Sequence, residues 1–371
     1  MFINRINSIN WQIIHKNIII LSLAFMLVIA QLNSLHYDPI RTYWGEITCA
    51  IAMLVLFIYT GFITKKIAIP YISVGILMFL ILILLQALFL KINFVGIPIN
   101  MSLELLLCIM LMLAIATLQS IYTPKTLVKY IAILLLIGGI LQALIGMIQY
   151  CNLFKYFNDI IFYDAKHPNT NIFGHFGQRN NYCHYLSWSI FALIYLYVED
   201  TINNTQTNFK DFKINLTNHK FSTYKTIIFI VVLLFLVFSA TISSSRSVFL
   251  YFIMASIISL SLTIRAFFVQ KNLVLNNQQQ FTHMVYIKYH AYKKYCFYTI
   301  AALVLLLIFG FFIPLIQNHF GVDHHKLHSG LERLVSDNTT GRRLFEWQKA
   351  WMIFLNNPIF GLGISTFPKQ D

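Results

Sequence analysis

Long apolar runs separated by short polar stretches make up most of the chain. Crossing the hydrocarbon core of a bilayer takes about 20 residues of helix, and nine runs approach or exceed that length. The sixth reaches it only if its helix starts inside the preceding polar loop, near Asn180. The pattern predicts an all-α, polytopic integral membrane bundle of about nine transmembrane helices. The expected spans are Ile18–Leu35, Glu46–Thr64, Ile67–Leu90, Met101–Tyr122, Leu127–Gln149, His184–Val198, Thr226–Ser243, Ser247–Ile264 and Phe297–Ile316.

Composition excludes a soluble globular protein. The 371 residues are 58% hydrophobic and 11% charged, against roughly 45–50% and about 25% in soluble domains. Five cysteines occur without a CxxC pair, so neither a zinc nor an iron–sulfur site is expected, and no metal or cofactor is predicted. The net charge of +14 does not indicate nucleic-acid binding, because no basic run with interleaved aromatic residues lies outside the loops.

Lysine and arginine set the expected orientation. With a cytoplasmic N-terminus, 15 of them fall in inward loops and six in outward loops before the long C-terminal segment, as the positive-inside rule requires. We expect a multi-pass protein of a bacterial inner membrane with its active face in the periplasm. Its expected parts are N-terminal helices (1–149), a periplasmic loop (150–183), a core of helices (184–316) and a periplasmic segment (317–371).

Three polar segments carry further expectations. The inward stretches Glu199–Lys225 and Arg265–Tyr295 are expected to be solvated connectors. In the C-terminal segment, Arg342–Phe354 places apolar and tryptophan residues at helical spacing, which predicts an amphipathic helix lying on the membrane.

Three outward arginine sites are the candidates for chemistry, since charge at the lip of a span is costly. Arg246 lies in a serine-rich turn between two spans, where hydroxyls and backbone N–H groups suit phosphate oxygens, although snorkelling to lipid headgroups is the alternative. Arg179 is flanked by the amides of Gln178 and Asn180. The third site, Arg342 and Arg343, has a solvated helix start as its alternative.

These motifs resemble a known superfamily. The stretch Gly174-His175-Phe176-Gly177-Gln178-Arg179-Asn180-Asn181-Tyr182 resembles the Gly-Gln-Pro/Arg-Asn-His signature of PglL-type protein O-oligosaccharyltransferases, with Arg179 and Asn181 in the variable places. The serine-rich turn at Arg246 resembles the Ser-x-Ser-Arg turn of the wider O-antigen ligase and Wzy polymerase superfamily. So does a third stretch: Gly341-Arg342-Arg343-Leu344-Phe345-Glu346-Trp347, then Ala350, Asn357-Pro358 and Gly361-Leu362-Gly363.

The resemblance implies transfer of a preassembled oligosaccharide from an undecaprenyl diphosphate carrier to a hydroxyl, without nucleotide sugar or metal. For the PglL type, the acceptor is Ser or Thr of a pilin-like or other exported protein. By the same resemblance, Arg246 and Arg343 hold the diphosphate, with Arg342 as the neighbouring alternative, and Gln178, Arg179 and Asn180 shape the carrier or glycan site.

The family's general-base histidine follows its Gly-x-Gly segment and is expected beyond Asp371, since the sequence ends eight residues past Gly363. Within the sequence the substitutes are His319, His324, His325 and His328. A serine hydroxyl is a poor nucleophile, so transfer needs such a base as well as stabilisation of the leaving diphosphate.

Several alternatives stay open. An O-antigen ligase acting on lipid A core and a Wzy-type polymerase would share the diphosphate site. A membrane transporter would fit the number of spans, but it predicts ionisable residues near the bilayer midplane, where this chain has neutral groups such as Gln86 and Gln142. The sequence also leaves open a disulfide between Cys151 and Cys183.

Overall fold

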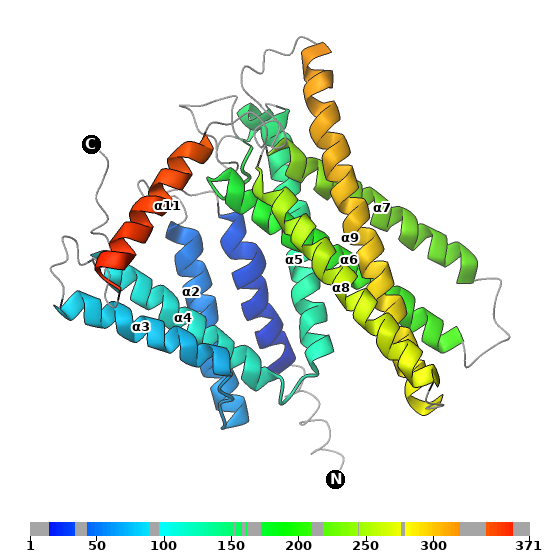
Figure 1. Ribbon diagram of the computed structural model, residues 1–371, viewed down its shortest axis with the longest axis horizontal. Coiled ribbons are helices and arrows are strands. Elements are labelled where there is room, and N and C mark those ends of the chain that lie inside the picture. The colour runs from blue at the N-terminus through cyan, green and yellow to red at the C-terminus, as the bar shows by residue number, and fades with distance from the viewer. Residues whose placement is uncertain are drawn as a thin grey trace. The chain divides into compact units, whose positions relative to one another are not determined.

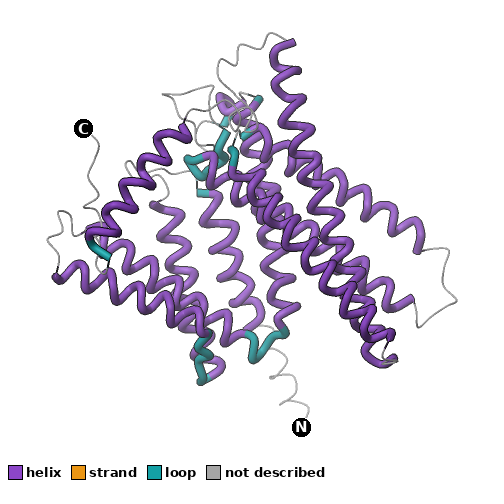
Figure 2. Tube along the Cα trace, viewed as in Figure 1, coloured by secondary structure: helices purple, strands orange, loops and turns teal. Residues whose placement is uncertain are grey.

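A computed structural model describes residues 15–33, 43–89, 96–151, 153–157, 161, 172–208, 218–243, 245–275, 279–319 and 339–358. All regular structure within these ranges is helical (Figures 1 and 2). The chain divides into two compact units. One unit comprises Met1–Met26, Glu46–Val128 and Asp337–Asp371; the other comprises Leu27–Gly45 and Lys129–Ser336. The expected all-α membrane bundle is confirmed.

The first unit is built from helices α2 (Tyr43–Thr64), α3 (Tyr71–Phe89) and α4 (Gly96–Leu118), with the start of the helix His15–Leu32 and with α11 (Thr339–Asn356). Helices α3 and α4 pack against each other. The Thr117 hydroxyl of α4 accepts a 2.9 Å hydrogen bond from the Ala68 N–H just before α3, which ties the two helices at one end.

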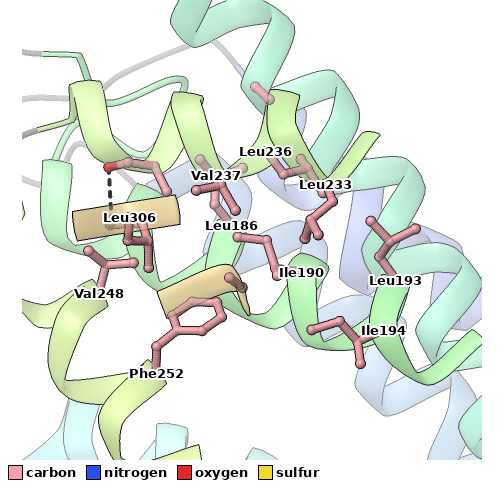
Figure 3. Close-up of a cluster of buried hydrophobic side chains, with 14 of the residues drawn as sticks. Leu186, Ile190, Leu193, Ile194, Leu233, Leu236, Val237, Val248, Phe252 and Leu306 are labelled. Atoms are coloured by element: carbon pink, nitrogen blue, oxygen red, sulfur yellow. Dashed lines mark hydrogen bonds between the residues drawn. The ribbon is translucent and has the colours of Figure 1, made fainter. Parts of the chain in front are cut away.

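The second unit contains α5 (Pro124–Tyr150) from Lys129 on, α6 (Arg179–Asn208), α7 (Asn218–Ile242), α8 (Ser247–Leu275) and α9 (Gln279–His319). Helix α6 packs against α7, α8 and α9. Figure 3 shows the core that results: Leu186 and Ile190 of α6 face Leu236 of α7, Phe252 of α8 and Leu306 of α9. All five side chains are fully buried.

Helix α5 approaches α6 through three glycines, Gly138, Gly139 and Gly146. A Cβ atom at these positions would lie 2.0–2.1 Å from Tyr185 Oη, Ser189 Oγ and Tyr182 Oη respectively. The missing side chains therefore make room for hydroxyl-bearing residues of α6, in the way that small residues let membrane helices approach closely. Ser189 Oγ uses this proximity to donate a 2.8 Å hydrogen bond to the Leu135 carbonyl of α5.

Eight helices among the described residues are long and apolar enough to cross a membrane, not the nine predicted. The difference is α6, which replaces the sixth predicted span and is long enough at 30 residues, but carries polar side chains. Tyr182, Ser187 and Ser189 are all fully buried there. A helix enclosed by other helices presents little of itself to lipid, so composition alone understates how well it fits a bundle.

The two polar segments expected to be solvated connectors are largely helical where the structure describes them. Helix α8 continues to Leu275 and α9 begins at Gln279, so most of Arg265–Tyr295 extends the two helices rather than linking their ends. Phe267 and Tyr289 lie against each other across this extension, with ring centroids 6.0 Å apart. Lysine and glutamine favour helix, and the neighbouring helix supplies a packing partner.

Candidate functional site

One end of the second unit gathers the end of α5, the start of α6, the end of α7 and the start of α8. Antiparallel packing causes this: Tyr182 near the start of α6 bonds Ser239 near the end of α7, with the hydroxyl oxygens 3.1 Å apart. At the opposite end, Lys225 at the start of α7 pairs with Asp200 of α6, with a shortest nitrogen–oxygen distance of 2.7 Å. The chain therefore returns after α7 to the level at which α6 begins.

Two of the three sequence motifs meet at this end. The Ser245 hydroxyl, in the turn between α7 and α8, donates a 3.0 Å hydrogen bond to Asn180 Oδ1 in the first turn of α6. Ser245 Oγ also lies 2.8 Å from Ser247 Oγ, at the first residue of α8. The amide-bearing motif and the serine-rich turn are joined directly, although 65 residues separate the bonded side chains.

The same contact brings two guanidinium groups together. Arg179 is the first residue of α6 and Arg246 immediately precedes α8, and both side chains are half-buried. Partial burial lowers the pKa of Arg179 below its ordinary value, and the nearby positive charge of Arg246 lowers it further. Two like charges thus face one region, which favours a bound anion there.

Helix geometry adds to this positive field. Helices α6 and α8 both begin here, and the N-terminus of a helix carries unsatisfied N–H groups and a partial positive charge. Gln178, just ahead of α6, and Asn180 are exposed and supply amide donors beside the arginines. The arrangement is suited to an anion with several oxygens, such as a phosphate or diphosphate.

The approach to α6 is held by two glutamines of α5. Gln149 Oε1 accepts hydrogen bonds from the N–H groups of Phe173 (3.2 Å) and Gly174 (2.9 Å), and its Nε2 donates to the Gly174 carbonyl (2.9 Å). Gln142 Oε1 accepts from the His175 N–H at 3.1 Å. Gly174 and Gly177 adopt positive φ angles of 56° and 63°, which glycine tolerates at low cost.

The end of the first helix lies against the same turn. Here the helix loosens into a π segment (η1, Phe25–Ile29) and a 3-10 turn (η2, Ala30–Leu32), as helix ends often do. His175 Nδ1 donates to the Leu32 carbonyl at 2.8 Å, Gln142 Nε2 donates to the Gln31 carbonyl, and Tyr185 Oη donates to the Leu27 carbonyl. These donors satisfy carbonyls that lose their regular helical partners.

An aromatic group lies one helical turn beyond the arginines. The His184 ring of α6 stacks on Tyr251 of α8, with centroids 4.3 Å apart, and its Nδ1 lies 3.2 Å from Tyr251 Oη. Trp188 packs against the other side of His184 at 5.3 Å and is about half exposed. This second link between α6 and α8 keeps Arg179 and Arg246 at the same level of the bundle.

The remaining expected site residues lie in other parts of the chain. Arg342 and Arg343 lie in the first turns of α11, which belongs to the other compact unit. His319 is the last residue of α9, and His324, His325 and His328 lie outside the described residues. Cys151 is exposed and Cys183 is buried, and the two are not paired with each other in this structure. Within the described residues, no three His, Cys, Asp or Glu side chains are grouped to hold a metal ion.

Comparison with known families links both halves of the site to one group of enzymes. Residues 229–371 match the family described as O-antigen ligase, and residues 172–197 match the family described as protein glycosylation ligase. Arg246 lies in the first match and Arg179 in the second. A comparison with curated proteins found no match, and neither did a comparison with solved structures. Both family matches support the superfamily of O-antigen ligases and PglL-type protein glycosylation ligases.

Proposed function

We propose that the chain transfers a preassembled oligosaccharide from an undecaprenyl diphosphate carrier to a Ser or Thr hydroxyl of an exported, pilin-like protein. The reaction takes place at the periplasmic face of a bacterial inner membrane, with the N-terminus cytoplasmic. The observation that carries the proposal is the half-buried pair Arg179 and Arg246, placed between the starts of α6 and α8.

In this reaction the acceptor oxygen forms a bond to the anomeric carbon as the bond from that carbon to the diphosphate oxygen breaks. The hydroxyl proton goes to a base, and the bonding electrons leave with the diphosphate. Guanidinium groups stabilise the departing charge because they donate two parallel hydrogen bonds and stay protonated. Arg179 and Arg246 fill this role, with Arg343 as the further diphosphate ligand and Gln178 and Asn180 contacting the carrier or glycan. The base is a histidine of the C-terminal segment, for which His319, His324, His325 and His328 are the candidates in this sequence.

The match over residues 172–197 favours a protein acceptor, because its family is described as a protein glycosylation ligase and it covers the segment next to Arg179. The longer match, over residues 229–371, supports the second candidate, an O-antigen ligase with lipid A core as acceptor. The two functions share the diphosphate site and differ in the acceptor, which is a protein in the first and lipid A core in the second.

The test is glycan transfer in cells that make the carrier-linked oligosaccharide. Arg246→Ala and Arg179→Ala are each expected to lower transfer on the order of a hundredfold, the typical cost of removing one group that stabilises developing charge. Arg265→Ala is the matched control, because Arg265 is an exposed arginine in the half of α8 that lies away from Arg246. Glycan found on a protein supports the proposal, glycan on lipid A core supports the second candidate, and full activity of Arg246→Ala refutes the diphosphate assignment.

A further inference from the structure

Two glutamines on α5 lie seven residues apart, two helical turns, and so share one face of the helix. Both use their side-chain amides on the same short backbone segment, Phe173 to His175. Gln149 makes three hydrogen bonds to it and Gln142 makes one, while Gln142 also donates to the Gln31 carbonyl. An amide both donates and accepts, so it can replace the partners that a regular helix or sheet would supply.

The held segment needs such partners. Two positive-φ glycines keep residues 173–178 out of regular structure, and the turn's own bond is a 3.1 Å contact from the Phe176 N–H to the Phe173 carbonyl. Helix α6 begins directly after it, with the Tyr182 N–H bonded to the Gln178 carbonyl at 3.1 Å. Any shift of the segment therefore moves the first turn of α6, which carries Arg179 and Asn180.

Packing leaves the segment no alternative position. A Cβ atom on Gly174 would lie 2.3 Å from Gln142 Oε1 and 2.8 Å from a ring carbon of Tyr182. Gln142 and Tyr182 are fully buried, so neither is free to withdraw. The glutamines therefore hold the segment in close contact with α5.

We propose that Gln142 and Gln149 are positioning residues for the transfer reaction: they hold residues 173–175 so that Arg179 stays beside Arg246. Neither contacts the carrier. Each acts through the backbone that leads into α6. This inference rests on the proposed function for its effect on activity, but the geometry that it describes is measurable without any substrate.

The experiment measures the distance between α6 and the turn before α8 directly. Asn180 and Ser245, whose side chains are bonded at 3.0 Å, are both replaced by cysteine, with Cys151→Ser to remove an exposed native thiol. A short bifunctional methanethiosulfonate reagent then joins the two thiols in membranes. The rate of this cross-linking is compared between the wild-type residue and the variants at position 149. Gln149→Met keeps the side-chain volume and removes all three bonds, whereas Gln149→Glu keeps both bonds to Phe173 and Gly174 N–H groups.

We expect cross-linking to fall several-fold with Gln149→Met and to be largely retained with Gln149→Glu. Transfer should follow the same order, with Gln149→Met losing on the order of tenfold to a hundredfold, since an ångström of misplacement is that costly. Gln142→Met, which loses the bond to His175, gives a second variant should Gln149→Met not fold. Gln86→Met, on α3 in the other unit, is the matched control and should cross-link like wild type.

The order of the two Gln149 variants separates positioning from packing. A side chain that merely fills space tolerates methionine better than a carboxylate, so cross-linking that is faster in Gln149→Met than in Gln149→Glu overturns the inference. Equal rates in wild type and both variants overturn it as well. If cross-linking follows the expected order but no glycan is transferred by the wild type, the proposed function fails and the positioning role stands.

Discussion

Replacing Arg246 with alanine should change the stability of the protein in opposite directions with and without an anion. Arg179 and Arg246 repel each other when the site holds no anion, as the lowered pKa of Arg179 indicates. Both groups are only half-buried, so solvent screening limits this repulsion to a few tenths of a kcal/mol, at most about 1 kcal/mol. Without an anion, Arg246→Ala is therefore expected to be as stable as the wild type or slightly more stable.

A bound diphosphate reverses the order. At a concentration a hundred times its Kd, a ligand stabilises the folded state by about 2.7 kcal/mol, which raises Tm on the order of 5 °C. Losing a charged hydrogen-bonding partner weakens binding by about 1.5–3 kcal/mol. The same ligand concentration should then stabilise Arg246→Ala by only about 0.3–1.3 kcal/mol.

The assay is thermal unfolding of the purified protein in detergent, with and without inorganic pyrophosphate, against sodium chloride of equal ionic strength. Arg265→Ala, which changes net charge equally, should keep the full pyrophosphate shift. If pyrophosphate stabilises Arg246→Ala as much as wild type, Arg246 does not bind the diphosphate. A variant that is strongly destabilised without anion would show that the guanidinium has a structural role instead.

Two further predictions concern packing and the membrane surface. Gly138→Ala should cost about 1–3 kcal/mol, because its Cβ would lie 2.0 Å from Tyr185 Oη. In the double variant with Tyr185→Phe, the atom of residue 185 nearest to the new Cβ is a ring carbon at 3.1 Å. In a double-mutant cycle measured by thermal unfolding, the double variant should therefore lose less stability than the sum of the losses of the two single variants. Losses that simply add would refute the close approach. On α11, Trp347 is 78% exposed and Trp351 is 60% exposed. If this helix lies on the bilayer, brominated lipids should quench the fluorescence of a variant that retains Trp347 as its single tryptophan. Quenching of that fluorescence by aqueous iodide but not by brominated lipids would contradict the placement.

The helices were predictable from sequence because each long apolar run has one stable form in lipid. For one helix, composition understates the fit to a membrane bundle because its polar side chains are buried. Helix α6 contains Tyr182, Ser187 and Ser189, which lower its mean hydropathy, yet all three lie inside the bundle with hydrogen-bond partners. A sequence does not state which face of a helix other helices will cover.

The glutamine contacts were missed for a related reason. Gln142 looked like a neutral group in the middle of a span, and its function depends on a segment more than 30 residues away. One signal was present: Gln142 and Gln149 share a face of an otherwise apolar helix, as the seven-residue spacing shows. Two amides on one face require partners in lipid, and an irregular, glycine-containing segment requires the same.

The meeting of Arg179 with Arg246 follows from helix lengths, although neither motif indicates it alone. Helix α6 has 30 residues and α7 has 25, so the chain travels about 45 Å along one and returns about 38 Å along the other. An antiparallel pair of nearly equal length brings the residue before the first helix and the residue after the second to the same end. Residues 172–197 and 229–371 match different family descriptions, and the α6–α7 hairpin brings Arg179 of the first match and Arg246 of the second to the same end of the second unit. Lengthening α7 by one helical turn near Val231 would change the rotational position of its C-terminal end little but would shift Arg246 by about 5 Å along the helix axis. This insertion should abolish transfer even though every site residue is intact.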